Sequence, residues 1–160
     1  MDEVEANNLQ VVVAELSAEL TARAGLQECV LRDLEWLHWG SVIRLSFEYF
    51  WQDVEGELRL TPEALNHPGV VELTASWMLA MNIDNAPTAS MVGLRPDEMT
   101  WGYSEVAVVE VVADTYAAEY LPESTCLRLE VHWEGERRIT IWCRDLAIET
   151  TRAPGLAGDR

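Results

Sequence analysis

Histidine and cysteine are the side chains of this sequence best suited to hold a metal ion. The chain contains three of each, namely His38, His67, His132, Cys29, Cys126 and Cys143. Zinc ligands usually occur in close pairs such as C-x-x-C, H-x-H or H-E-x-x-H, because two ligands on one turn or strand then reach the same ion. The sequence has no such pair. We therefore expect no metal site and no cofactor.

Nucleophilic catalysis has equally little support. Cys143 falls on the apolar side of an expected strand, where a thiol is usually inert, and neither a G-x-S-x-G motif nor a glycine-rich phosphate loop is present. Carboxylates lie close together by chance in a chain with 28 acidic residues, so paired acids indicate no enzyme class. We expect no enzyme. The alternative is a small-ligand-binding protein or hydrolase that uses His132 and nearby carboxylates in a pocket between helix and sheet.

Acidic residues are the first candidates for binding a partner, because they concentrate in three places. They are Asp53, Glu55 and Glu57 on one turn, Asp97, Glu98 and Glu105 around a long loop, and Glu130, Glu134 and Glu136 about the last hairpin. If these groups converge on one side, they form the electrostatic half of an interface with an Arg- or Lys-rich protein. If they do not converge, they are a solvated surface.

Aromatic residues divide into an expected core and two candidate anchors. Five fall on the apolar faces of expected strands and are predicted to be core: Phe47, Tyr49, Trp51, Trp77 and Trp133. Trp39 and Trp101 sit near turns instead. Exposed aromatic residues inside an acidic rim are typical of interface anchors. The alternative is that both pack under a loop.

The net charge limits the classes of partner. The formal charge is −17, from 28 acidic and 11 basic residues, and every base is arginine. Such a field repels nucleic acids and anionic membranes and favours encounter with basic proteins. Solubility, GC-rich coding or a salt-loving host would also explain the composition.

The chain of 160 residues is expected to form one domain over residues 1–150, followed by a flexible tail over 151–160. No apolar run approaches the roughly 20 residues of a membrane span, and Asp2, Glu3 and Glu5 stand where a secretory signal would carry bases. We expect a cytoplasmic protein with reduced cysteines.

The N-terminal region predicts one helix that positions the rest. After a frayed leader over residues 1–7, Asn8 can cap a helix that Gly25 ends. Its apolar stripe consists of Leu9, Val12, Val13, Leu16 and Leu20. A helix with a single stripe is expected to cover a sheet.

From Cys29 onward the hydrophobic period is two, which predicts strands. A hairpin is expected over 29–51 with its turn at Gly40 and Ser41, then a short strand over 58–60, a long strand over 71–79 and an irregular connection over 82–102. Further strands are expected over 106–112, 127–133 and 139–143, the last extended to 149 beyond a kink at Arg144 and Asp145. The fold class is α+β, mainly β, with the helix packed on a mostly antiparallel sheet of about six or seven strands.

Three segments resemble the small β-rich immunity proteins of bacterial polymorphic-toxin systems. They are the strand over 42–47, the strand over 127–133 and the closing run over 138–149. The resemblance implies a non-catalytic inhibitor that occludes the active site of a basic toxin or effector domain, and it assigns no functional residue. The N-terminal helix and the connection after Asn82 depart from it. A structural or adaptor subunit of a larger assembly is the alternative; the sequence determines neither the partner nor the oligomeric state.

Overall fold

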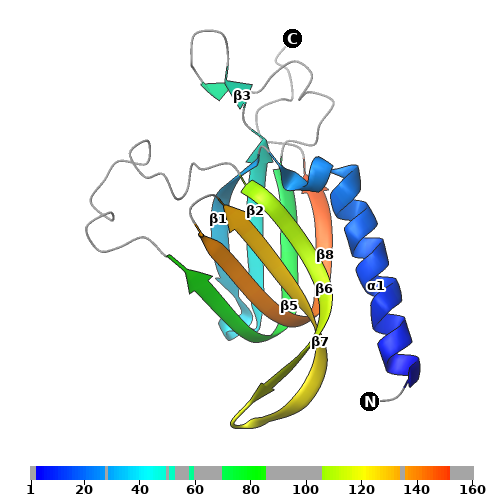
Figure 1. Cartoon of the computed structure of the whole chain (residues 1–160). Coiled ribbons are helices and arrows are strands. Elements are labelled where there is room, and N and C mark those ends of the chain that lie inside the picture. Colours follow the sequence, from blue (N-terminus) through cyan, green and yellow to red (C-terminus); the bar gives the residue numbers. More distant parts are fainter. Residues whose placement is uncertain are drawn as a thin grey trace.

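In the described part of the chain, one N-terminal α-helix accompanies a large antiparallel sheet. The computed structural model describes residues 3–27, 29–49, 51–52, 58–59, 70–85, 106–133 and 136–151. The elements are α1 (Glu3–Ala22), η1 (Ala24–Leu26), β1 (Cys29–Leu37), η2 (His38–Gly40), β2 (Val42–Tyr49), β3 (Trp51–Gln52), β4 (Leu58–Arg59), β5 (Val70–Asp84), β6 (Val106–Ala118), β7 (Leu121–Trp133) and β8 (Arg138–Thr151). The predicted α+β class, mainly β with a helix on an antiparallel sheet, is confirmed (Figure 1).

Six strands form the main sheet in the order β1-β2-β5-β8-β7-β6, and every neighbouring pair is antiparallel. The predicted first hairpin is β1–β2, and the predicted last hairpin is β7–β8. The short strand β4 pairs with β3 in a separate sheet of two strands.

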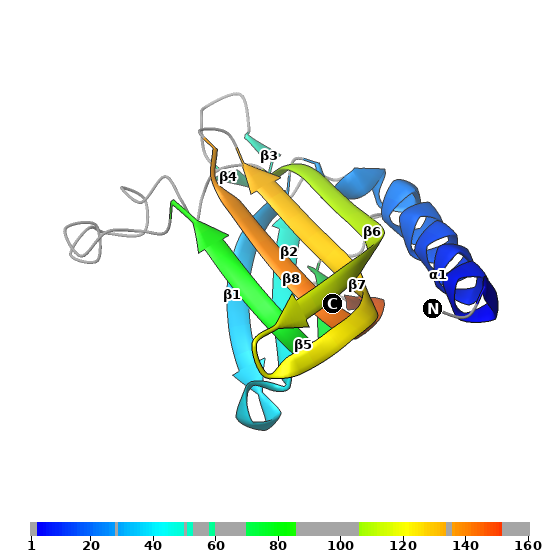
Figure 2. The same cartoon turned by 60° about the horizontal axis from the view of Figure 1, so that its bottom comes forward.

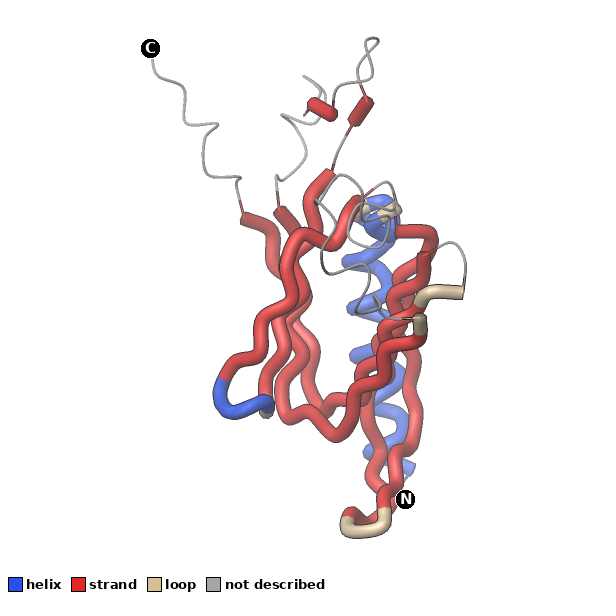
Figure 3. The backbone as a smooth tube through the Cα atoms, turned by 90° about the vertical axis from the view of Figure 1, so that its left-hand side faces the viewer, coloured by secondary structure: helices blue, strands red, loops and turns tan. Residues whose placement is uncertain are grey.

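The main sheet is folded over, because β5 and β8 each run through two halves. Residues 70–76 of β5 lie between β2 and residues 145–151 of β8. Farther along, residues 78–84 of β5 pair with residues 138–143 of β8, which also pairs with β7. Between Met78 and Ala80 the register shifts by one residue, and such bulges bend a strand. Figure 3 shows the two halves with the strands turning between them.

The core lies between the halves. Alternate residues of each strand point inward, so Phe47 and Leu73 of one half and Val131 and Ile141 of the other are fully buried in one cluster. Helix α1 contributes Leu16 and Leu20 to that cluster.

Helix α1 lies beside β6, as Figures 1 and 2 both show. The predicted leader over residues 1–7 is wrong, because the helix already begins at Glu3. Val12, predicted on the buried stripe, is 40% exposed, whereas Leu16 and Leu20 are buried as expected. Gly25 follows the helix with φ 63°, the left-handed conformation in which glycine is favoured.

Several predicted boundaries also differ. β5 continues to Asp84, into the region expected to be an irregular connection, and residues 86–105 lie outside the described residues. β8 passes Arg144 and Asp145 without interruption, and it includes Thr151, which was expected to begin the tail. The remaining tail residues, 152–160, lie outside the described part of the chain.

Candidate protein-binding surface

The outer face of the β1-β2-β5-β8 half is acidic. Strand register places three rows of residues across this face: Asp33, Ser46, Glu72 and Glu149; Glu35, Arg44, Thr74 and Ala147; Leu37, Val42, Ser76 and Asp145. Five carboxylates thus come together from three strands, and we call Asp33, Glu35, Glu72, Asp145 and Glu149 the acidic face. Arg44 is the only base in these rows.

Charge on the acidic face is only partly neutralised. Arg44 Nη1 lies 3.3 Å from Glu35 Oε2, and both side chains are more than a third exposed. Glu72 and Glu149 occupy directly opposite positions on β5 and β8, where like charges destabilise a sheet. Two like charges therefore occupy facing positions on the acidic face.

Trp39 stands at the tip of the β1–β2 hairpin and is fully exposed. The backbone there is left-handed over three residues, with φ of 48° at His38, 60° at Trp39 and 83° at Gly40. Ser41 holds the turn, since its N–H and hydroxyl both donate to the His38 carbonyl at 3.2 and 2.8 Å. Left-handed backbone is unfavourable for a bulky residue, so the turn presents this indole at an energetic cost.

Two further tryptophans lie at the same end of the sheet. Trp36 is 57% exposed, and its ring lies against Gly40, because a Cβ built there would be 3.7 Å from Trp36 Cε3. Trp77 is 70% exposed, and the next residue, Met78, donates its N–H to the Ser41 carbonyl at 3.1 Å. We call Trp36, Trp39 and Trp77 the tryptophan cluster.

The prediction that Trp77 belongs to the core is wrong. Trp77 has φ 55° and directly precedes the register shift of β5, so the alternation that governs residues 71–75 does not continue through it. Phe47 and Trp133 are buried as predicted, whereas the side chains of Tyr49 and Trp51 are not described. Trp39 is exposed and does not pack under a loop.

Among the predicted binding residues that the structure describes, Trp39 is separated from Glu130 and Glu136. The turn that carries Trp39 lies beside the middle of β5, because the Met78 N–H of β5 donates to the Ser41 carbonyl of that turn. Glu136 lies beyond the end of β5, where its carbonyl accepts a hydrogen bond from Asn85 Nδ2 at 3.0 Å. The other predicted binding residues lie outside the described part of the chain: Asp53, Glu55, Glu57, Asp97, Glu98, Trp101, Glu105 and Glu134.

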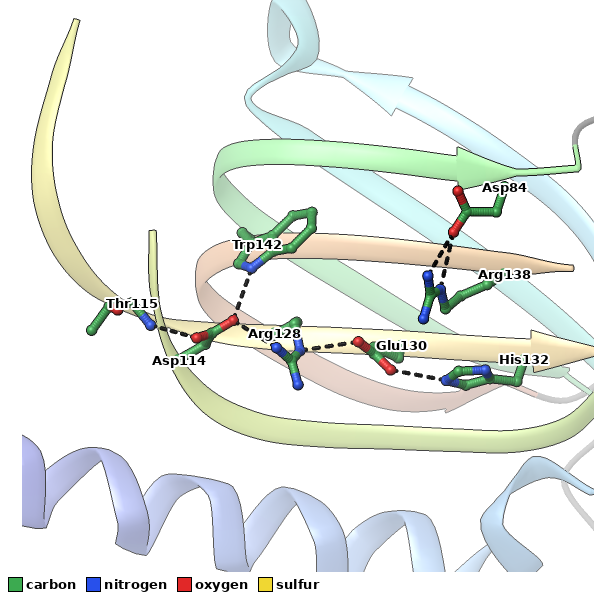
Figure 4. Close-up of polar contacts among 8 residues, drawn as sticks. All are labelled: Asp84, Asp114, Thr115, Arg128, Glu130, His132, Arg138 and Trp142. Carbon is green, nitrogen blue, oxygen red and sulfur yellow. Dashed lines mark hydrogen bonds and ion pairs between the residues drawn. The ribbon is translucent and has the colours of Figure 1, made fainter. Parts of the chain in front are cut away.

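Glu130 belongs to a polar chain on the outer face of the other half of the sheet (Figure 4). Its carboxylate lies 3.1 Å from Arg128 Nε and 2.9 Å from His132 Nε2, and its side chain is only 16% exposed. Arg128 Nη1 also donates to Asp114 Oδ2 at 2.9 Å, and Trp142 Nε1 donates to the same oxygen at 3.0 Å. Glu130 is therefore engaged within the protein.

Asp114 accepts hydrogen bonds from Arg128, Trp142 and the Thr115 N–H. Burial alone would raise its pKa, but hydrogen bonds from Trp142 and the Thr115 N–H, together with the Arg128 charge, hold the pKa below its ordinary value. Nearby, hydrogen bonds from Arg138 and Asn82 lower the pKa of Asp84.

An open pocket of about 540 Å³ lies beside the polar side chains that include Glu130 and His132. It is lined by Asp84, Asn85, His132, Glu136 and Arg138. It contains the histidine of the hydrolase alternative. Asp84 Oδ2 accepts two hydrogen bonds from Arg138, at 3.0 and 2.9 Å, and His132 faces Glu130. A carboxylate fixed to a guanidinium is a poor general base, and Glu130 engages one ring nitrogen of His132.

Cys29, Cys126 and Cys143 are buried, and none of the three forms a disulfide bond. Burial raises the pKa of the Cys143 thiol to about 12, and burial is also the main reason that the pKa of Cys126 is raised. Over the described ranges, no group of three or more His, Cys, Asp and Glu side chains is placed to hold a metal ion. No helix among these residues has the length and apolar character to cross a membrane.

The residues that sequence reasoning missed carried a signal of their own. Asp33, Glu35 and Glu72 each occupy the polar side of an expected strand, but only the strand order brings them together. Grouping acids by their proximity in the sequence therefore selected turns and overlooked a surface assembled from separate strands.

Comparison with known proteins adds a distant structural neighbour. No protein-family model and no curated protein matches the chain. One similar solved structure is an uncharacterized protein from Neisseria gonorrhoeae, with a TM-score of 0.41 and 14% sequence identity over 77% of this chain and 91% of that one.

Proposed function

We propose that this chain is a non-catalytic protein-binding domain that holds a basic partner through the tryptophan cluster and the acidic face. The observation that carries the proposal is the exposure of Trp36, Trp39 and Trp77 around the β1–β2 turn, in the half of the sheet whose outer face carries five carboxylates. Tryptophan is among the residues that contribute most to binding energy at interfaces, and a hydrated sheet gains nothing from exposing three of them together.

The two parts of the surface have different tasks in this mechanism. The carboxylates attract and orient a basic protein during encounter, which raises the association rate at low salt. The indoles then bury their apolar rings against the partner, which slows dissociation. The net charge of −17 supports the first step.

More specifically, we propose an immunity-type inhibitor, whose partner is a basic toxin or effector domain. Steric occlusion of the partner's active site needs no chemistry from this chain. The resemblance of three strand segments to immunity proteins of polymorphic-toxin systems supports this version. An adaptor subunit would use the same surface without inhibiting its partner.

The test is recovery of a partner from native lysate with tagged protein at about 0.1 M salt and again near 0.5 M, where screening weakens exposed charge pairs. A basic partner should be recovered, less of it at the higher salt, and Trp39→Ala should reduce recovery at both. Tyr120→Ala is the matched control, because Tyr120 is an exposed aromatic residue at the distant β6–β7 turn. An assay of the partner's activity with and without this protein then separates inhibitor from adaptor.

The pocket beside His132 supports a second candidate, a binder of a small polar ligand. Arg138 and His132 line its opening and would meet an anionic group. If no protein partner is recovered at either salt, while a soluble anionic metabolite fraction raises the unfolding temperature and His132→Ala abolishes that rise, this candidate replaces the first.

A further inference from the structure

Strand β1 is one edge of the main sheet. It pairs with β2 on one side, and no other described strand pairs with it. An edge strand carries backbone N–H and C=O groups without ladder partners, and proteins usually protect such edges.

Among the side chains that the structure describes, Asp33 forms a hydrogen bond with this edge. The Leu34 N–H donates to Asp33 Oδ1 at 2.8 Å, so this amide points away from β2. Because amides alternate in direction along a strand, the Trp36 amide also points outward, whereas the Glu35 amide points to β2.

At the opposite edge, β6, an aspartate also accepts a hydrogen bond from the next backbone N–H, but its carboxylate is fixed by further contacts. There the Thr115 N–H donates to Asp114 Oδ1 at 2.8 Å, but Asp114 is also held by Arg128 and Trp142, and α1 packs along β6. Asp33 is exposed and makes no ion pair with any described residue. The β1 edge can therefore open by rotation of one surface side chain, and the β6 edge cannot.

We propose that β1 receives an extended segment of the basic partner as an additional strand, with basic and apolar side chains alternating along that segment. The basic side chains would lie beside Asp33 and Glu35 on the acidic face. The apolar ones would lie on the opposite side, beside Leu34 and the exposed ring of Trp36. This inference rests on the proposed function and names its mode of recognition.

The probe is a short synthetic peptide in which arginine and valine alternate, with binding followed by fluorescence anisotropy at about 0.1 M salt. In an antiparallel addition the valine amides face β1, and the arginine amides face solvent. N-methylation of the valines should weaken binding about tenfold or more, whereas N-methylation of the arginines should leave it nearly unchanged. A parallel addition reverses the two results.

The proposal is overturned if the unmodified peptide does not bind, if both methylated peptides bind as well as it does, or if both lose binding. Equal binding of both, together with loss of the native partner from the Trp39→Ala variant, would leave the proposed function standing without strand addition. A glutamate–valine peptide controls for charge and should not bind.

Two measurements on the protein locate the peptide. By NMR hydrogen exchange, the peptide should protect the Leu34 and Trp36 amides and leave the Glu35 amide unchanged; unaltered exchange at Leu34 and Trp36 would exclude the β1 edge. Trp36→Pro, which removes the outward amide, should bind the peptide about tenfold more weakly than Trp36→Ala, which keeps it. Equal affinities in the two folded variants would also count against strand addition.

Discussion

At the scale of single residues, the turn between β1 and β2 places a fully exposed tryptophan on left-handed backbone. Trp39 has φ 60° between His38 at 48° and Gly40 at 83°. Its side chain is fully exposed, so packing gives nothing in return. Strained backbone that no internal contact offsets is a common property of functional sites.

Trp39→Asn should therefore increase the free energy of unfolding by up to about 1 kcal/mol, because asparagine tolerates left-handed backbone better than tryptophan. The same variant should lose binding to the recovered partner. Urea denaturation measures the first effect and partner recovery the second. Tyr120→Asn should show neither gain nor loss, and a destabilised Trp39→Asn variant would mean that the indole packs in solution.

The lowered pKa of Asp114 predicts that its contribution to the free energy of unfolding depends on pH. Its pKa is lowered in the folded state, so its bonds contribute stability above the ordinary carboxyl pKa and lose it as pH falls through the folded value. Asp114→Asn should cost about 1 kcal/mol near neutral pH. The difference from the parent protein should shrink to zero in acid, below the ordinary Asp pKa of about 3.9. Urea titrations across this pH range measure it, and a difference that stays constant would refute the assignment.

At the scale of elements, the C-terminal turns of α1 attach the helix to the core. Leu16 and Leu20 are buried in the core, whereas Val11 and Val12 are exposed by 55% and 40%. The helix lies beside β6, and only part of its expected apolar stripe is buried.

Leu20→Ala should lower the free energy of unfolding by about 2–3 kcal/mol, because it leaves a cavity in the cluster between helix and sheet. Val12→Ala should change it by less than about 0.5 kcal/mol. Thermal or urea unfolding of the two variants checks the comparison. Similar losses in both would show that the whole predicted stripe packs.

Local patterns predicted the elements well and their assembly poorly. Alternation in 42–47 and 127–133 identified two strands, and Gly40 and Ser41 located the first turn, because side-chain direction and turn chemistry are local properties. The contact of β5 with both β2 and β8 joins segments that are far apart in the chain. The acidic face depends on that order, and the exposure of Trp77 depends on a bulge, so neither followed from the period.

At the scale of the whole molecule, negative charge is spread along the sequence and is also gathered on the acidic face. The net charge of −17 attracts a basic protein from every direction, and the acidic face adds five carboxylates near the turn that carries the fully exposed Trp39. Glu72 lies directly opposite Glu149 on this face, an arrangement that usually destabilises a sheet.

The most direct test of the proposed surface compares Glu72→Arg with Glu123→Arg, measured by the association and dissociation rates of the recovered partner. Both substitutions change the net charge equally, and Glu123 is exposed on β7 outside the acidic face. Glu72→Arg should weaken binding about tenfold or more while stabilising the fold by a few tenths of a kcal/mol, through its new neighbour Glu149. Glu123→Arg should alter affinity far less. Equal effects of the two substitutions would contradict the account, because general attraction to an acidic protein would then explain binding without this surface.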